Sequence, residues 1–460
     1  MSSIKKLSDL DITSLMNEAK DLTFLVGAGI STKSPSRLPT ARNMMNELIK
    51  YVCTPSEVNS ILKIETLKFE TFLGILHDIL DENLHLVDYY LECDKPNVLH
   101  FFLSEMMKKG NYVITSNFDY LIELALLKLD VPKKKLIPVI TEKDFNKYDD
   151  PEKLMKSGKV PLYKIHGSPK NMITGEDTRE SFVNTIYLIS LNHDKNNIIQ
   201  LEPYKSSVLE SLTKGRTLVV MGYSGNNDTD IISSIKVLNE LENIIWINHV
   251  DDTRKKLEIH EYNVENLKDS DELKGLDQIL FDLKHINPNK GIYRIDINTP
   301  NFIENFLSSK ETLDSEEFQL DIKKWLPTIL EQPNELQKLF VSYKIYYETA
   351  TYTEALRMLD RIYRLADESD EKTWKSKALI EMGKINYVQG QFEKALDWFQ
   401  KAGRILVKVK DYTQRSTIFK YIGLINQKQN NFSEAIKYFD LASKEIEKAR
   451  NLSEKSKIVK

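Results

Sequence analysis

The sequence is poor in the residues that hold small secreted proteins and zinc modules together. Its 460 residues include only two cysteines, Cys53 and Cys93. Two cysteines cannot form a disulfide framework, and they cannot supply a four-cysteine zinc site. Glycine and proline are also sparse, at 16 and 14 residues, as in a globular protein. We expect no zinc and no other bound metal.

Long apolar runs and an excess of positive charge are missing as well. No stretch approaches the roughly 18 to 20 apolar residues of a membrane helix, and the polar N-terminus has no signal-peptide pattern. The net charge of −4 creates no overall basic field that would attract nucleic acid. We therefore expect a cytoplasmic protein that contacts neither a membrane nor nucleic acid directly. A chain of this length is expected to form two or three domains.

The first 300 residues or so alternate short β-rich runs with helical stretches. Apolar runs that end in glycine or polar turns, with helices between them, predict a parallel sheet covered on both faces. The fold class is therefore α/β, with a Rossmann-like sheet. The predicted strands are Leu22–Val26, Tyr112–Thr115, Tyr163–Ile165, Thr217–Met221, Ile244–Asn248 and Gly291–Ile297.

From about residue 335 the β pattern disappears and a repeat begins. Ala355, Ala395 and Ala435 are spaced 40 residues apart, and Gly383 and Gly423 each stand twelve residues before an alanine. Small residues at helix crossings resemble the tetratricopeptide repeat. The alternative is an ordinary helical bundle. The predicted domains are an α/β domain at 1–305, a helical linker at 306–335 and an all-α repeat domain at 336–460.

A glycine-rich turn follows the first predicted strand. Residues 27–31 read GAGIS, and the helical stretch that follows runs from Leu38 to Val52. Glycine at positions 27 and 29 removes Cβ atoms that would keep a phosphate away from backbone N–H groups. On its own this loop is a weak signal, because the full G-x-G-x-x-G pattern is absent and a glycine turn after a strand is more often just a tight turn.

Four more polar or glycine-rich turns follow predicted strands. Asn117 and Asp119 come after the second strand and His166 after the third. Gly222-Tyr223-Ser224 follows the fourth strand, and Asn248 is the last residue of the fifth. Ligands of open α/β sheets bind at these carboxyl ends. A histidine there suits proton transfer near neutral pH. Taken singly, Asn117 and Asp119 could instead form an Asx-turn and helix cap, and His166 could be structural.

The order of these turns resembles the sirtuin family over roughly residues 10–300. The matching motifs are GAGIS at 27–31, TSNFD at 115–119, His166-Gly167, Gly222-Tyr223-Ser224 and Ile247-Asn248. The resemblance implies NAD as the substrate and Asn117 and His166 as the catalytic residues. It further implies that NAD is bound by Gly27, Ala28, Gly29, Ser31, Pro39, Arg42, Asp119, Gly222, Ser224 and Asn248. Among these, Asp119 would recognise the carboxamide and Asn248 the adenosine ribose.

The departures from the family change the expected reaction. Pro39 and Arg42 match a family motif, but Ala41 replaces its aromatic residue, which covers the reacting ribose. No cysteine follows Cys93, so the zinc module of deacetylating sirtuins is absent. What remains looks like the sirtuin-like domains of bacterial anti-phage systems, which hydrolyse NAD to ADP-ribose and nicotinamide.

We therefore predict an NAD glycohydrolase (a hydrolase, or NADase) that acts in antiviral defence by abortive infection. Its activity is expected to be gated by residues 336–460, either through a homo-oligomer or through a protein partner such as a phage protein. Two alternatives stay open: an NAD-dependent protein deacylase, and an inactive NAD-binding sensor or scaffold. The other histidines, among them His100, show no metal-ligand spacing and are interpreted as structural or surface residues.

Overall fold

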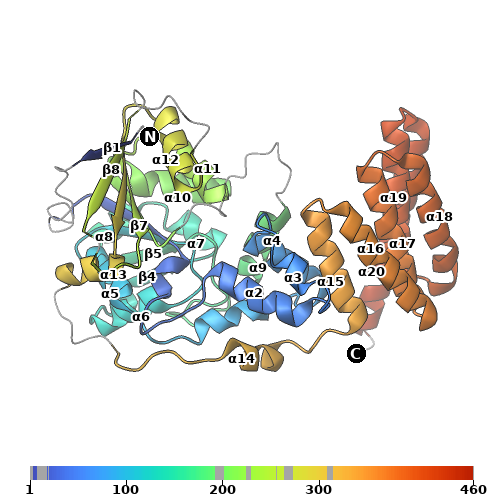
Figure 1. The fold of residues 1–460 in the computed structure, drawn as a ribbon, viewed down its shortest axis with the longest axis horizontal. Helices are drawn as coiled ribbons and strands as arrows, with labels where there is room; N and C mark the ends of the chain where they lie inside the picture. The colour runs from blue at the N-terminus through green and yellow to red at the C-terminus, as the bar shows by residue number, and fades with distance from the viewer. Residues whose placement is uncertain are drawn as a thin grey trace. The chain divides into compact units, whose positions relative to one another are not determined.

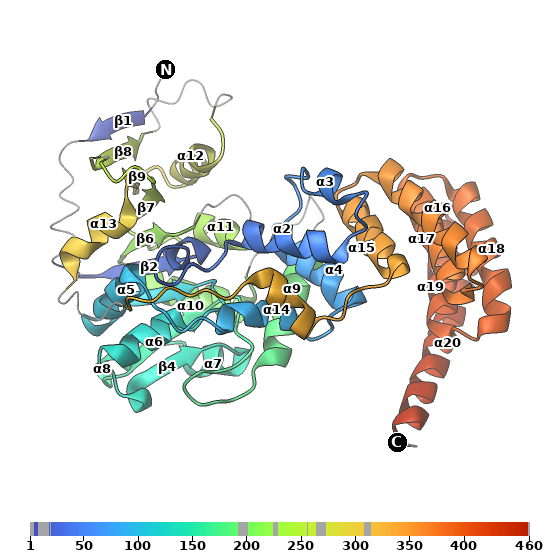
Figure 2. The ribbon, with the colours of Figure 1, turned by 60° about the horizontal axis from the view of Figure 1, so that its bottom comes forward.

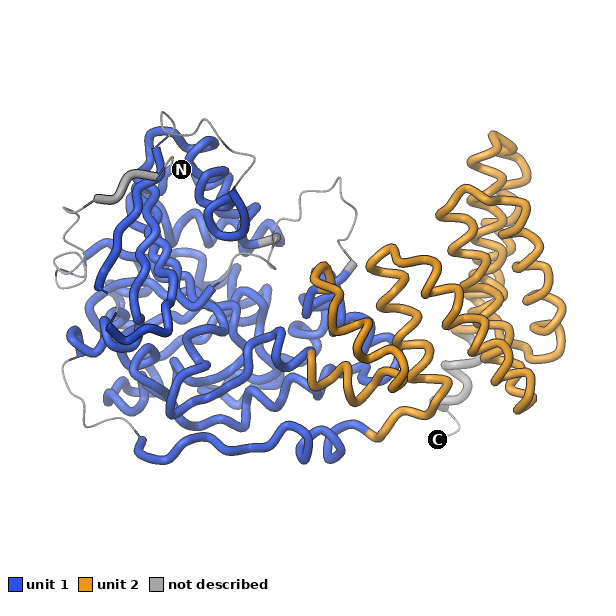
Figure 3. Tube along the Cα trace, viewed as in Figure 1, with its two compact units in different colours: residues 1–45, 68–330 blue, residues 46–67, 331–460 orange. Residues whose placement is uncertain are grey.

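The computed structural model divides into two compact units, which Figure 3 shows in different colours. Unit 1 contains residues 1–45 and 68–330, and unit 2 contains residues 46–67 and 331–460. The structure describes residues 4–7, 18, 20–191, 201–223, 229–254, 256–263, 273–307 and 314–458.

Unit 1 is built around a nine-stranded sheet with the order β1-β8-β9-β7-β6-β2-β3-β5-β4 (Figure 1). Pairing is parallel from β9 through to β4, and β8 and β1 add an antiparallel edge. From β2 the chain builds one half of the sheet, then returns through β6 to build the other. The strands are β1 Ile4–Leu7, β2 Leu22–Val26, β3 Tyr112–Thr115, β4 Leu136–Val139, β5 Val160–Lys164, β6 Thr217–Met221, β7 Asn243–His249, β8 Glu258–Tyr262 and β9 Gly291–Ile297.

Helices cover both faces of the sheet because successive strand residues point to opposite sides. In β2, Phe24 and Val26 belong to one apolar cluster and Leu25 to the other. The first cluster includes α5 (Val98–Lys108) and α6 (Leu121–Lys128), and the second includes α10 (Pro203–Thr213), α11 (Thr229–Lys236) and α12 (Leu276–Ile286). This three-layer arrangement confirms the predicted α/β Rossmann-like fold.

The sheet differs from the prediction mainly at its margins. Strands β1, β4 and β8 were not predicted, and the edge next to β9 is antiparallel rather than parallel. Strand β4 contains Pro138, which lacks a backbone donor and is tolerated because β4 lies at the sheet edge. Strand β5 runs from Val160 to Lys164 instead of 163–165. The remaining helices of unit 1 are α4 Phe69–Ile79, α7 Glu142–Lys147, α8 Pro151–Lys156, α9 Arg179–Leu191, α13 Thr299–Ile303 and α14 Ile322–Ile329.

Unit 2 contains three helix pairs and the short helix α3 (Val58–Ile61), which Figure 2 shows from a second side. The glycines of the repeat lie where paired helices touch. A Cβ on Gly383 would be 2.5 Å from the Phe399 ring, and one on Gly423 would be 2.7 Å from the Phe439 ring. The pairs are α15 Glu335–Glu348 with α16 Tyr352–Glu368, α17 Lys372–Val388 with α18 Phe392–Val409, and α19 Tyr412–Lys428 with α20 Phe432–Ile458.

This all-α region was expected from the repeat, and its helical character is confirmed. Its assignment to the tetratricopeptide family stays a prediction, as do the domain boundaries at 305 and 335. Helix α2 (Ala41–Val52) begins in unit 1 and ends in unit 2, and residues 46–67 group with the C-terminal helices. Within the described part of the chain, no helix combines the length and apolar character needed to cross a bilayer.

Candidate active site

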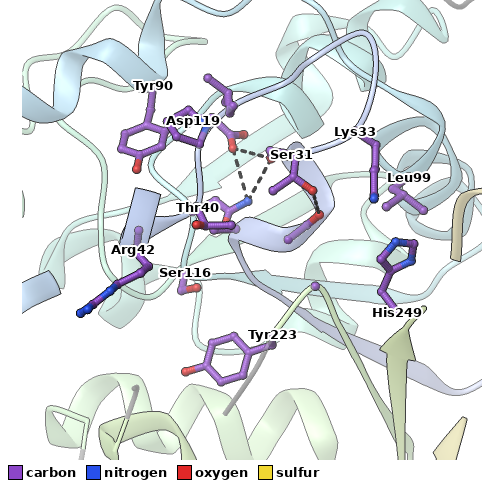
Figure 4. Close-up of a pocket in the computed structure, with 18 of the residues that line it drawn as sticks. Ser31, Lys33, Thr40, Arg42, Tyr90, Leu99, Ser116, Asp119, Tyr223 and His249 are labelled. Atoms are coloured by element: carbon purple, nitrogen blue, oxygen red, sulfur yellow. Dashed lines mark hydrogen bonds between the residues drawn. The ribbon is translucent and has the colours of Figure 1, made fainter. Parts of the chain in front are cut away.

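The carboxyl ends of five neighbouring strands surround one pocket in unit 1. Its volume is about 520 Å³, within the range of ligand-binding pockets. Residues of the turns after β2, β3, β5, β6 and β7 line it, and Figure 4 shows part of this lining. The pocket lies where the sheet topology reverses between β2 and β6, the position at which open α/β sheets bind their ligands.

Most of the predicted site residues meet at this pocket. Gly27 does not line it, and Ser224 lies outside the described residues. The members of the prediction that do line the pocket are Ala28, Gly29, Ser31, Pro39, Arg42, Asn117, Asp119, His166, Gly222 and Asn248.

The glycines of the first turn allow two loops to approach each other. A Cβ on Gly29 would be 2.8 Å from Cα of Gly222, and one on Gly27 would be 2.5 Å from the Tyr223 ring. Gly222 itself has φ +63°, a conformation that favours glycine. The N–H of Gly29 donates to Gly222 O at 2.8 Å, and that of Gly27 donates to Met221 O at 3.1 Å. Two of the amides expected to face a phosphate are therefore bonded within the protein.

Ser31, Asn117 and Asp119 form a buried hydrogen-bonded cluster at one wall (Figure 4). The Ser31 hydroxyl donates to Asp119 Oδ2 at 2.8 Å, and Asn117 Nδ2 lies 3.3 Å from both of these oxygens. Asp119 Oδ1 accepts from the N–H of Leu121, the first residue of α6, and so forms an Asx-turn, although the N-cap position itself is Tyr120. The Asx-turn alternative and the site assignment are thus compatible, because the two carboxylate oxygens serve different partners.

Asn117 presents an unused acceptor at this wall. Its side chain is 7% exposed, and its Oδ1 has no hydrogen-bond partner among the described residues. A buried polar atom without a partner costs about 1–3 kcal/mol. Since Asn117 lines the pocket, a ligand hydroxyl or a water molecule could satisfy this oxygen.

His100 is a structural residue, one of the two interpretations that the sequence favoured, and it supports the pocket wall from behind without lining the pocket. It is fully buried in α5, and its Nδ1 accepts from the N–H of Asn97 at 3.0 Å. Nε2 of the neutral ring therefore carries the proton and donates to Ser31 Oγ at 3.1 Å. Burial lowers the pKa of His100 to about 4, although the charge of Asp119 opposes the shift. The spacing Asn97-x-x-His100, a helix-capping pattern, was the only available signal.

The turn that carries His166 is joined to the Asp119 turn by a buried lysine. Lys164 Nζ donates to Asp119 O at 2.6 Å and to Glu123 Oε1 at 3.0 Å. His166 follows two residues later, is 3% exposed and lines the pocket. Gly167 adopts φ +79° directly after it, a left-handed conformation that turns the chain sharply. His166 is thus held on a turn whose position depends on Asp119.

The far arm of the pocket is polar and follows β7. Asn248 Nδ2 donates to Asp296 Oδ1 at 2.8 Å. In the described part of the chain, Asp296 also belongs to a group with Glu258 and His260 whose ligand atoms could hold a metal ion. Arg294 Nη2 already donates to Asp296 Oδ2 at 3.2 Å, so a guanidinium occupies the place of a cation beside this carboxylate.

Residues 111–267 match the family model of the SIR2-like domain. The match extends from β3 to just beyond β8 and includes Asn117, Asp119, His166, Gly222 and Asn248. The GAGIS loop and the C-terminal helices lie outside it. This supports a sirtuin-like domain with an NAD-related function in this part of the chain. A search of curated proteins finds no match for the chain.

Proposed function

We propose that the protein is a sirtuin-like NAD glycohydrolase, which cleaves NAD into ADP-ribose and nicotinamide. The observation that carries the proposal is the buried Oδ1 of Asn117, which has no partner in the described part of the chain and lies in a pocket that His166 also lines. Hydrolysis of this bond needs an oriented water or ribose hydroxyl and a nearby base. Asn117 and His166 supply these two kinds of group.

The reaction replaces the bond between ribose C1′ and the nicotinamide nitrogen by a bond from C1′ to water oxygen. Nicotinamide leaves with the bonding electrons as a neutral ring, and the water loses one proton. In our assignment, Asn117 Oδ1 accepts a hydrogen bond from the water or a ribose hydroxyl, and His166 takes the proton. Asp119, oriented by Ser31 and Asn117, would hold the carboxamide.

The pyrophosphate would lie over the two glycine loops that meet at the topological switch. Since the amides of Gly27 and Gly29 bond to Met221 O and Gly222 O, the phosphates would depend on other groups. Arg42 and Ala28 line the same pocket, and we assign the phosphate contacts to them. No zinc is required in this scheme.

Release of nicotinamide from NAD by the purified full-length protein tests the proposal. We expect His166→Ala to lower the rate by about 10²- to 10⁴-fold, the usual effect of removing a general base. Asn117→Ala should show a large loss as well. Asn59→Ala and His285→Ala, which change exposed residues outside the pocket, should match the wild type.

Other outcomes of the same experiment identify the alternative functions. Faster acyl removal from a peptide than plain NAD loss would indicate a deacylase. Binding of NAD without turnover under every activating condition would indicate a sensor or scaffold. Equal rates for wild type and His166→Ala would contradict the catalytic assignment.

We further propose that the activity serves antiviral defence and is gated through residues 336–460. An uncontrolled NAD hydrolase would harm its own cell, and stacked helix pairs suit the binding of a protein trigger or a second copy of the chain. Cellular NAD should fall after phage infection of cells that express the wild type and stay constant with Asn117→Ala. An NAD level that infection leaves unchanged in wild-type cells would contradict this role.

A further inference from the structure

The topology assigns the two halves of a dinucleotide to different arms of the pocket. Asn117 and His166 follow β3 and β5, on one side of the switch between β2 and β6, whereas Asn248 follows β7 on the other side. A dinucleotide whose pyrophosphate crosses the switch therefore has its second nucleoside at the β7 arm. This placement rests on the proposed function, in which the nicotinamide half lies beside His166.

Two titratable side chains of the β7 arm and a lysine of the first loop are joined through one carboxylate oxygen. Asp251 Oδ1 lies 2.7 Å from Lys33 Nζ and 3.2 Å from His249 Nε2. His249 Nδ1 accepts from the N–H of Thr299 at 3.2 Å, so its Nε2 carries the proton that faces Asp251. In Figure 4, Lys33 and His249 lie on the same side of the pocket, away from Asp119.

The charges of this group cancel. Burial and the neighbouring Lys33 lower the pKa of His249, which keeps the ring neutral at pH 7. The lysine and the carboxylate then carry one positive and one negative charge. Asp251 is the more exposed partner and lines the pocket together with Lys33.

The arm offers hydrogen-bond acceptors to a ligand. Asn248 Nδ2 donates one of its two N–H groups to Asp296, and the amide Oδ1 remains as an acceptor. Asp251 Oδ2 has no hydrogen-bond partner among the described residues, because both contacts of that carboxylate go to Oδ1. Ribose hydroxyls donate to such oxygens. A phosphate group has only acceptors and about two negative charges at pH 7, so it would meet the carboxylate unfavourably.

We propose that Asp251 is a specificity-determining residue that makes the site select NAD over its 2′-phosphorylated form, NADP. It accepts from a ribose hydroxyl and holds Lys33, the cation that would otherwise attract a 2′-phosphate. Dinucleotide sites distinguish NAD from NADP in two general ways. A carboxylate accepts a hydrogen bond from the ribose 2′-hydroxyl of NAD, or a cation binds the 2′-phosphate of NADP. This chain contains both a carboxylate, Asp251, and a cation, Lys33. Their ion pair neutralises the lysine and leaves the carboxylate to bind the ribose hydroxyl.

Equilibrium binding of NAD and NADP to the full-length protein tests the inference. Calorimetry in a His166→Ala background prevents cleavage during the measurement. We expect NAD to bind at least about tenfold more tightly than NADP, and Asp251→Asn to reduce this ratio by about tenfold. Adding Lys33→Gln to Asp251→Asn should restore most of the preference. Asp252→Asn, an adjacent acidic residue that does not line the pocket, is the matched control and should change nothing.

Three results would overturn the inference: equal affinities of the parent for NAD and NADP, an unchanged ratio in Asp251→Asn, or no binding of either dinucleotide. Nicotinamide release by the wild-type protein separates this inference from the proposed function. If NAD binds with the expected preference but is not cleaved, the glycohydrolase proposal fails and the specificity assignment stands. If NAD is cleaved but Asp251→Asn leaves the preference unchanged, the specificity assignment fails and the glycohydrolase proposal stands.

Discussion

The buried His100 ring makes the stability of the α/β unit depend on pH. Its Nδ1 faces the N–H of Asn97, so protonation of the ring would place two donors against each other. Replacing His100 by glutamine removes the titrating group and keeps a neutral side chain that can donate to Ser31. The variant isolates the contribution of this one ring.

The size of the effect follows from the lowered pKa of His100. Burial moves the pKa from 6.5 in a free histidine to about 4 in the folded protein. Each pKa unit corresponds to about 1.4 kcal/mol, so the complete effect is about 3 kcal/mol. The unfolded chain binds the proton below about pH 6.5, whereas the folded protein resists it down to about pH 4. The contribution of the neutral His100 ring to the free energy of unfolding is therefore fully present above pH 6.5 and decreases as the pH falls toward 4.

Urea unfolding at pH 7, 5.5 and 4.5, followed by tryptophan fluorescence, measures the free energy of unfolding. At pH 7 we expect His100→Gln to be less stable than the wild type by about 1–2 kcal/mol, because the hydrogen bonds of the ring are weakened. The difference should shrink or reverse at pH 4.5, since only in the wild type does the unfolded chain bind a proton at this ring that the folded protein excludes. His285→Gln, at an exposed position, should follow the wild type. Parallel pH dependence of His100→Gln and the wild type would refute the reasoning.

Two further predictions concern glycines at close contacts. Gly29→Ala places a Cβ 2.8 Å from Gly222 Cα. We expect this overpacking to lower the free energy of unfolding by about 1–3 kcal/mol and to weaken NAD binding, both measured by thermal unfolding with and without NAD. Unchanged melting and binding would contradict the close approach of the loops. Gly383→Ala should destabilise the helical unit by a similar amount, because the new Cβ would contact the Phe399 ring. The control is Gly403→Ala, whose Cβ would have no neighbouring atom within 4 Å. This variant should stabilise the same unit by about 0.5–1 kcal/mol. Equal melting temperatures for these two variants would argue against the contact.

Local patterns predicted the strands at the centre of the sheet better than those at its edge. The central strands β2, β3 and β6 are mostly apolar and fully buried, and their predicted bounds agree with the structure. Strand β8 reads Glu-Ile-His-Glu-Tyr and is half-buried, so its sequence carries little β signal. Strands at the edge of a sheet or next to it, as β8 is, tolerate polar residues and proline, and these weaken the pattern on which such predictions depend.

The site was predicted where function follows directly from a strand end and missed where it depends on packing. Asn117, Asp119 and His166 each come within a few residues of a strand, so sequence order alone suggested that they meet. His100 stands in the first turn of an apolar helix, and its contact with Ser31 joins residues 69 positions apart. Lys33 and Asp251 are 218 positions apart in sequence. No local spacing reveals such pairs, because only the folded sheet brings the segments together.

The sequence by itself determined the α/β class, the helical C-terminal region and the set of strand-end residues that line the pocket, because these depend on periodicity and on the order of motifs along the chain. Only the tertiary structure decided what the GAGIS glycines do. They bring the first loop against Gly222, and two of their amides are bonded within the protein. Only the structure showed the unpartnered oxygen of Asn117 and the ion pair of Lys33 with Asp251. Burial and hydrogen-bond partners are properties of the packed chain, and these properties distinguish a glycine turn from a site that can act on NAD.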